Sequence, residues 1–132
     1  MKFLTILAFA LLLPIAAHAQ QANYGDACNA WLGLIDAGKY DQSWDTASDY
    51  FKSKITKEQW APMVKAVRDT VGPPLSRSAK SVTPTETLPA APFGKYIVIV
   101  LSTKFAMNQS ATETVILKLE NGEWKVAGYF VK

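Results

Sequence analysis

The sequence predicts an α+β fold in which three N-terminal helices pack on one face of a curved, four-stranded antiparallel sheet. Segments with helical spacing of apolar residues come first, and strand-like segments joined by short connections follow. The strongest local signal is Asn121-Gly122, because this pair suits a two-residue type I′ turn and alternating apolar residues flank it over 113–131. The chain is therefore expected to end in a hairpin that completes the sheet.

The helices are predicted over residues 23–37, 40–51 and 56–71. In each segment apolar side chains recur every three or four residues, which places them on one helical face. Gly38 suits the left-handed position that commonly ends a helix. Thr56-Lys-Glu-Gln59 has the pattern of a capping box, so the third helix is expected to begin there.

The first two strands are predicted over residues 75–85 and 95–105, with loops over 87–94 and 106–111. The first is polar and contains Pro84, which suits a sheet edge. The second is a long apolar run typical of a central strand. The turn at 121–122 predicts that the hairpin aligns Leu119 with Trp124, Leu117 with Val126 and Val115 with Gly128.

Residues 1–19 have the pattern of a secretory signal peptide. Met1-Lys2 is a positively charged start, a short apolar run follows, and Ala17-His18-Ala19 suits cleavage before Gln20. Residues 20–132 are therefore expected to form a single exported domain, periplasmic or secreted. No transmembrane segment is expected in the mature chain, because no later apolar run approaches the roughly 20 residues that a spanning helix needs.

Composition narrows the function classes. The whole chain carries 14 Lys and Arg against 11 Asp and Glu, and loss of Lys2 with the leader would leave a net charge of +2. The lysines form no stripe, so nucleic acid is not expected as a partner. His18 is the only histidine and would leave with the leader, which argues against His-dependent catalysis. No metal site and no cofactor are expected, because a single cysteine and scattered carboxylates supply few ligands.

Cys28 is the only cysteine, so it cannot form an intramolecular disulfide. It shares a helical face with Tyr24, Trp31 and Ile35, which favours a buried thiol that acts as a small hydrophobic side chain. A reactive thiol or an intermolecular disulfide is the alternative.

Four aromatic residues on the helices admit two interpretations: Trp31, Trp44, Phe51 and Trp60. They could line a pocket for a small apolar ligand between the helices and the sheet. They could also form the core, and each buried aromatic side chain removes roughly 150–250 Å² from water, an area that a domain of this size needs for stability. The core interpretation is preferred, and the ligand-binding one stays open.

The sheet face away from the helices is expected to be partly apolar. The residues assigned to it as a candidate partner surface are Tyr96, Val98, Val100, Ile116 and Tyr129. A half-apolar outer face can bind a protein partner or a second copy of the chain to form a homodimer. The alternative is an ordinary outer face, because strands favour β-branched residues in any setting.

The charged residues suggest ordinary surface pairs. Arg77 is expected to pair with Asp69, and the alternative is that it binds a carboxylate of a ligand or partner. Lys104 is expected to pair with Glu113 across neighbouring strands. Asp45 and Asp49 share a face of the predicted second helix, where they could resemble an acid/base pair. A solvated helix surface is the preferred interpretation.

The chain resembles an exported bacterial family, the domain-of-unknown-function 4019 family. The motifs that carry the resemblance are Trp31-x-x-x-Ile35-Asp36-x-Gly38-x-Tyr40-x-x-Ser43-Trp44, Gln59-Trp60, Ser76-Arg77, Leu88-Pro-x-x-Pro-x-Gly-x-Tyr96, Thr103-x-Phe105, Glu113-Thr-Val and Trp124-x-Val-x-Gly-Tyr129. The resemblance covers residues 31–131 and implies export and architecture, but it assigns no activity and no catalytic residue. The expected architecture is also similar to the cone of nuclear transport factor 2-like folds.

Three functions are consistent with these observations. The first is a small non-enzymatic module that binds a protein partner or itself through the outer sheet face or the loop over 87–94. The second is a binder of a small apolar ligand in a helix–sheet cavity. The third is an enzyme that uses carboxylates alone, without histidine.

Overall fold

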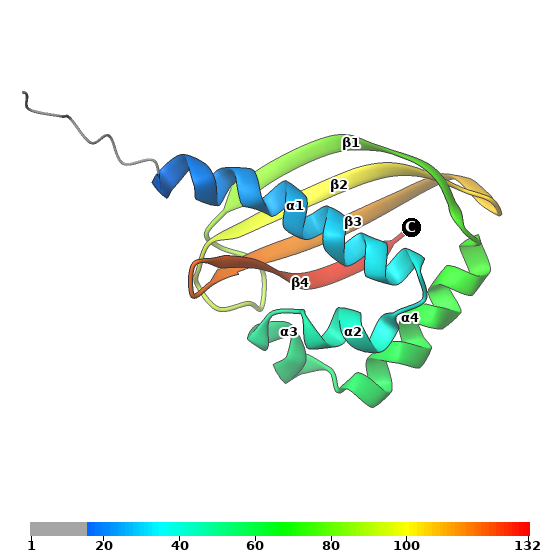
Figure 1. Cartoon of the computed structure of the whole chain (residues 1–132), viewed down its shortest axis with the longest axis horizontal. Helices are drawn as coiled ribbons and strands as arrows, with labels where there is room; N and C mark the ends of the chain where they lie inside the picture. The colour runs from blue at the N-terminus through cyan, green and yellow to red at the C-terminus, as the bar shows by residue number, and fades with distance from the viewer. Residues whose placement is uncertain (1–15) are drawn as a thin grey trace, which may run out of the picture.

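The computed structural model describes residues 16–132, with side chains described from Tyr24 onward, so most of the leader predicted over 1–19 lies outside the described residues. The elements are α1 (Ala16–Asp36), α2 (Tyr40–Asp45), α3 (Asp49–Lys54), α4 (Lys57–Val71), β1 (Pro74–Thr85), β2 (Tyr96–Phe105), β3 (Asn108–Glu120) and β4 (Glu123–Val131). The strands form one antiparallel sheet in the order β1-β2-β3-β4 (Figure 1). The predicted α+β fold class is confirmed.

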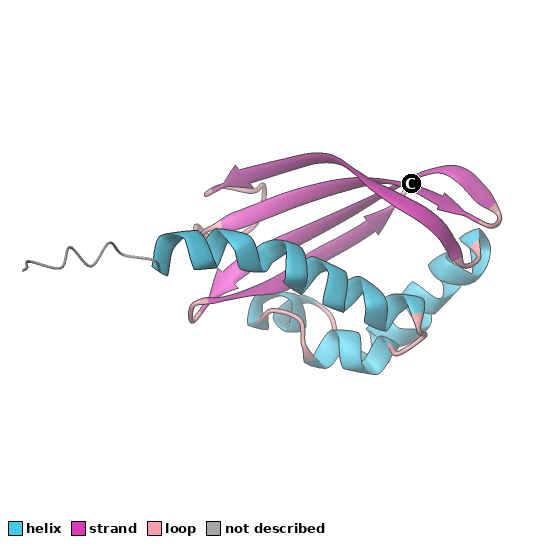
Figure 2. Ribbon diagram, turned by 45° about the horizontal axis from the view of Figure 1, so that its top comes forward, coloured by secondary structure: helices cyan, strands magenta, loops and turns pink. Residues whose placement is uncertain are grey.

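The helices form one layer and the sheet forms the other. Figure 2 shows all four helices on the same side of the twisted sheet, with the opposite face left uncovered. Side chains of α1, α3 and α4 bury against Ile97, Ile99 and Leu101 on the inner face of β2 and against Val115 and Leu117 on β3. None of the described helices is long and apolar enough to cross a membrane.

The number of helices was predicted incorrectly, because the segment 40–51 contains two short helices. Thr46 ends α2, and Ser48 starts α3 by accepting a hydrogen bond from Phe51 N–H at 3.0 Å. The Ser48 N–H donates to Val126 O on β4 at 2.8 Å, which ties the break to the sheet. Asp45 and Asp49 therefore lie on different helices, and the shared helical face expected for them is wrong.

The helix ends follow the predicted local signals. Gly38 has a φ of 72° after α1, and Gly72 has a φ of 77° after α4. Both hydrogen bonds of the Thr56/Gln59 capping box are present. The first helix begins earlier than predicted, at Ala16 instead of residue 23.

The terminal hairpin has the predicted turn but a different register at its far end. Asn121 and Gly122 have φ values of 52° and 79°, as a type I′ turn requires. Leu119 pairs with Trp124 and Leu117 with Val126, which confirms two of the three predicted pairs.

The third predicted pair, Val115 with Gly128, is wrong because β4 contains a bulge. Val115 lies opposite Tyr129, and Ile116 lies opposite Gly128, so Ala127 is an extra residue in β4. The bulge lets Val126 and Tyr129, three residues apart, both face the helices. Phe130, at the next position, faces outward.

The connection between β2 and β3 is shorter than the predicted loop over 106–111. Only residues 106 and 107 lie between the two strands, and Phe105 pairs with Asn108. The turn is fixed to the end of α4, because Ala106 N–H donates to Pro73 O and Met107 N–H donates to Val71 O, both at 2.9 Å.

Candidate functional site

The helical aromatic residues are packed mainly as core. Trp31, Phe51 and Trp60 are buried, and ring centroids lie 6.2 Å apart for Trp31–Trp60 and 4.9 Å apart for Phe51–Trp60. The two indole N–H groups converge on one buried residue: Trp31 donates to Ser43 O and Trp60 to Ser43 Oγ, each at 2.9 Å. Trp44 is only partly buried, and its indole N–H donates to Ile55 O at 2.8 Å.

Two of the five residues assigned to the outer partner surface are not available there. Tyr129 faces inward, with its ring 5.2 Å from that of Trp31, so its assignment to the outer face is wrong. The cause is the bulge at Ala127, since one extra residue reverses the alternation of side chains beyond it. Tyr96 is buried, and its hydroxyl donates to Pro92 O at 2.6 Å. The Tyr96 side chain is therefore buried and bonded to the β1–β2 connection, and it is not free to contact a partner.

Phe130 takes the place that the sequence had given to Tyr129. Phe130 is 56% exposed. It pairs with Thr114, which in turn pairs with Val100, so Phe130 lies on the outer face in line with Val100. It therefore extends an outer-face patch formed by Val98, Val100 and Ile116. A Cβ on Gly128 would lie 3.3 Å from the Phe130 ring and 3.4 Å from Ile116 Cδ1, so Phe130 and Ile116 meet over this glycine.

Phe130 also borders a groove beside the sheet. The groove has a volume of about 370 Å³ and lies between α4 and the end of β4, with Met63 and Val67 on its helical wall. We use the term "β4 surface" for these outer-face and groove residues together, which are Met63, Val67, Val98, Val100, Ile116 and Phe130. Strand β4 itself is an edge of the sheet.

A buried charged cluster joins the sheet to the helices at the opposite end of the sheet from the hairpin turn. Its central group is Glu113, which has no exposed surface. Oε1 accepts from Thr103 Oγ1 at 2.7 Å and from Arg77 Nε at 2.5 Å. Oε2 accepts from Arg77 Nη2 at 3.2 Å and from the Tyr129 hydroxyl. Each oxygen thus has two donors, which fills the lone-pair positions of the carboxylate.

The cluster continues from Arg77 to the ends of two helices. Asp36, the last residue of α1, accepts from Arg77 at 2.5 and 2.7 Å and from Arg68 of α4 at 2.8 Å. The Arg68 guanidinium also lies 5.0 Å from the centre of the Phe105 ring. Helix C-termini carry partial negative charge, and Asp36 adds to it at the end of α1. The positive charges of Arg68 and Arg77 offset both the Asp36 carboxylate and the partial negative charge at the end of α1.

This arrangement corrects two predicted ion pairs. Arg77 pairs with Asp36 and Glu113, while Asp69 pairs with Lys65 at 2.5 Å. Glu113 lies opposite Leu101 on the inner face and does not pair with the exposed Lys104. One sequence signal could have placed Glu113 correctly: it alternates with Ala111, Val115 and Leu117 along β3, and every second residue of a strand shares a face.

The electrostatic environment favours a fixed cross-link over a reactive group. Burial would raise the pKa of Asp36, but hydrogen bonds from Arg77 and Arg68 outweigh it and hold that pKa below the usual range. Burial and the Glu113 charge raise the pKa of the Tyr129 hydroxyl. Burial, together with the Glu113 charge, also raises the pKa of Cys28 to about 11, so this core thiol stays protonated at neutral pH.

The lowered pKa of Asp36 predicts a loss of stability in acid. A carboxyl whose pKa is lower in the folded state stabilises the fold above its unfolded-state pKa, about 4, and this contribution disappears as the pH falls further. Urea unfolding measured between about pH 6 and pH 2.5 should therefore show a shallower acid dependence for Asp36→Asn than for the wild type. Asp26→Asn, on an exposed part of α1, is the matched control for the loss of one carboxylate. Equal slopes for Asp36→Asn and the wild type would contradict the assignment.

No group of three or more His, Cys, Asp or Glu side chains among the described residues is placed to hold a metal ion. The strongest polar cluster is instead a set of opposite charges that neutralise one another. Chemically it can lock the ends of α1 and α4 to β1, β3 and β4, and its carboxylates carry donors where a general base would need a free position.

The sequence was compared with models of known protein families. A family described as "Protein of unknown function (DUF4019)" matches residues 27–129. The chain belongs to this family. The match spans α1 to β4 and includes the charged cluster, the aromatic core and Tyr129. The description of the family names no activity. A search of curated proteins finds no match.

Proposed function

We propose that the protein is a small binding module that associates through the β4 surface, with a second copy of the chain as the first candidate partner. The observation that carries the proposal is Phe130, which is 56% exposed where the outer-face patch meets the α4 groove. Large exposed aromatic residues within an apolar patch are common anchors of protein interfaces. An edge strand beside the patch adds backbone groups that can pair with another strand.

The alternative of an apolar ligand among the helical aromatic residues is less well supported. Trp31, Phe51 and Trp60 contact one another and Tyr129, so a ligand between them would have to displace core side chains. A carboxylate-dependent enzyme also has little support, because Glu113 and Asp36 already accept hydrogen bonds from arginine.

We also propose that the module acts after export, in a bacterial periplasm or outside the cell. The support is the leader pattern of residues 1–19. Helices on one side of a twisted antiparallel sheet likewise support a relation to nuclear transport factor 2-like cones. Mass measurement of the exported chain tests the first point, since a mature N-terminus at Gln20 is expected.

Sedimentation velocity over a concentration series tests association through the β4 surface. Phe130→Glu should weaken self-association by about tenfold or more, because it places a charge where an apolar side chain would be buried. Met107→Glu is the matched control: Met107 is 65% exposed, but it lies in the β2–β3 turn and does not line the α4 groove. A wild-type chain that stays monomeric at millimolar concentration would exclude the second copy as partner, and equal weakening by both variants would exclude the surface.

A further inference from the structure

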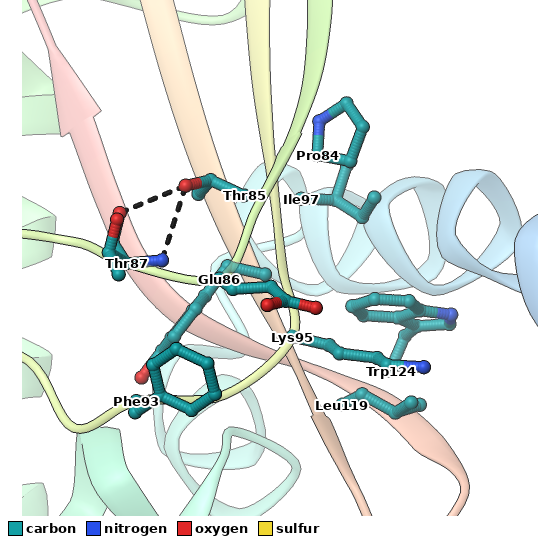
Figure 3. Close-up of a pocket in the computed structure, with 10 residues that line it drawn as sticks. Pro84, Thr85, Glu86, Thr87, Phe93, Lys95, Ile97, Leu119 and Trp124 are labelled. Carbon is teal, nitrogen blue, oxygen red and sulfur yellow. Dashed lines mark hydrogen bonds between the residues drawn. The ribbon is translucent and has the colours of Figure 1, made fainter.

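A concave pocket lies at the other end of the sheet from the charged cluster. It has a volume of about 700 Å³ and opens between the β1–β2 connection and the β3–β4 hairpin. Figure 3 shows that its lining comes from the end of β1, the β1–β2 connection, the start of β2 and the hairpin around Trp124. Pockets that bind small molecules in proteins commonly have volumes of about 300–1,000 Å³.

The wall of this pocket is held in place by hydrogen bonds. Tyr96 fixes the connection through Pro92 O, and the Tyr50 hydroxyl of α3 donates to Ala90 O at 3.2 Å. Within the connection, Gly94 N–H donates to Glu86 O at 3.2 Å. A connection anchored from both the sheet and a helix needs little further ordering on binding, and that preorganisation favours affinity.

The lining combines an apolar floor with opposite charges. Ile97, Leu119 and Trp124 contribute the floor, and Phe93, 75% exposed, stands at the rim. The exposure of an aromatic ring next to an apolar floor leaves a face on which a flat ligand can stack.

Lys95 lies directly over this floor. Its carbonyl accepts from Leu119 N–H at 2.9 Å, which fixes its backbone to the sheet, and its side chain extends toward Trp124 (Figure 3). Glu86 lies on the connection, and its carboxylate points toward the same space (Figure 3). Neither residue forms an ion pair with another side chain of the described part of the chain.

We propose that this pocket binds a compact aromatic molecule with an acidic group, the ring packing between Phe93 and Trp124 and the acid facing Lys95. Lys95 is the better placed of the two charges because its carbonyl is hydrogen-bonded to Leu119 of β3, whereas the carbonyl of Glu86 is bonded only to Gly94 within the same connection. Glu86 opposes the acid and limits affinity. The site is separate from the β4 surface and shares no residue with it.

Two fluorescent probes with the same aromatic body separate the apolar and ionic parts of this proposal. Anilinonaphthalene sulfonate carries an acidic group and N-phenylnaphthylamine lacks it. Lys95→Gln should weaken binding of the sulfonate by about tenfold and leave the neutral probe unchanged. Phe93→Ala should weaken both probes, and Glu86→Gln should strengthen the sulfonate alone.

Met107→Ala and Phe130→Ser serve as controls, because both residues are exposed and lie outside the pocket. Neither should change the affinity for either probe. The proposal is overturned if Phe93→Ala and Lys95→Gln leave sulfonate binding intact, or if Phe130→Ser abolishes it. The second result would place the dye on the β4 surface and would leave the association proposal standing, so the two proposals fail separately.

Discussion

Glu113→Ala is expected to lower the free energy of unfolding by about 3–5 kcal/mol, because removing one partner from a buried charged network leaves the others uncompensated. Arg77 would lose its contact on the sheet side, and the hydroxyls of Thr103 and Tyr129 would lose their acceptor. Urea unfolding followed by tryptophan fluorescence measures the change. Glu123→Ala, on the exposed side of the hairpin turn, is the matched control and should change the free energy by less than about 0.5 kcal/mol.

A second variant separates the value of the charge pair from the cost of breaking it. Glu113→Leu combined with Arg77→Met removes both charges of this pair, while Asp36 loses Arg77 and keeps Arg68. The double variant should be less destabilised than the sum of Glu113→Leu and Arg77→Met alone, because each single variant leaves the other charge of the pair buried without its partner. If the double variant is as unstable as that sum, the two residues do not act as a pair.

The sequence allowed prediction of the features that depend on neighbouring residues. Asn121-Gly122, the Thr56/Gln59 capping box and Gly38 each impose a local backbone conformation, and each occurs as expected. Apolar alternation then placed Ile97, Ile99 and Leu101 on the helix side of the sheet. These signals work because a turn or a cap involves only a few consecutive residues.

Features that depend on tertiary contacts were not predictable in the same way. The break between α2 and α3 is stabilised by Ser48, whose N–H bonds to Val126 on a distant strand. The bulge at Ala127 brings both Val126 and Tyr129 to the core. These residues are three apart, whereas strict alternation along a strand places only residues an even number apart on the same face. The same bulge exchanged Tyr129 for Phe130 on the outer face, so the candidate partner surface changed with it.

The two ends of the sheet have different roles in this arrangement. At one end, Asp36, Arg68, Arg77 and Glu113 tie α1 and α4 to the sheet, and both carboxylates accept hydrogen bonds from arginine. At the other end, the pocket beside Trp124 carries charges that form no ion pair with each other. The first end is thus suited to stability and the second to binding, which directs ligand searches away from the buried acids.

Trp31→Ala should destabilise the fold by about 3–5 kcal/mol, the range observed when a large aromatic side chain is removed from a core. The substitution removes ring contacts to Trp60 and Tyr129 and leaves Ser43 O without its indole donor. Chemical unfolding monitored by circular dichroism is the suitable measurement, because fluorescence would lose one of its reporters.

Trp44→Ala provides the matched comparison, since the same atoms are removed from a side chain that is only partly buried. Its effect should be clearly smaller than that of Trp31→Ala, because less apolar surface returns to water and neighbouring side chains can relax. This pair of variants decides between the two interpretations of the helical aromatic residues. If Trp31→Ala cost less than about 1 kcal/mol, its ring would be a pocket wall and not a core element. A ligand between the helices and the sheet would then regain support.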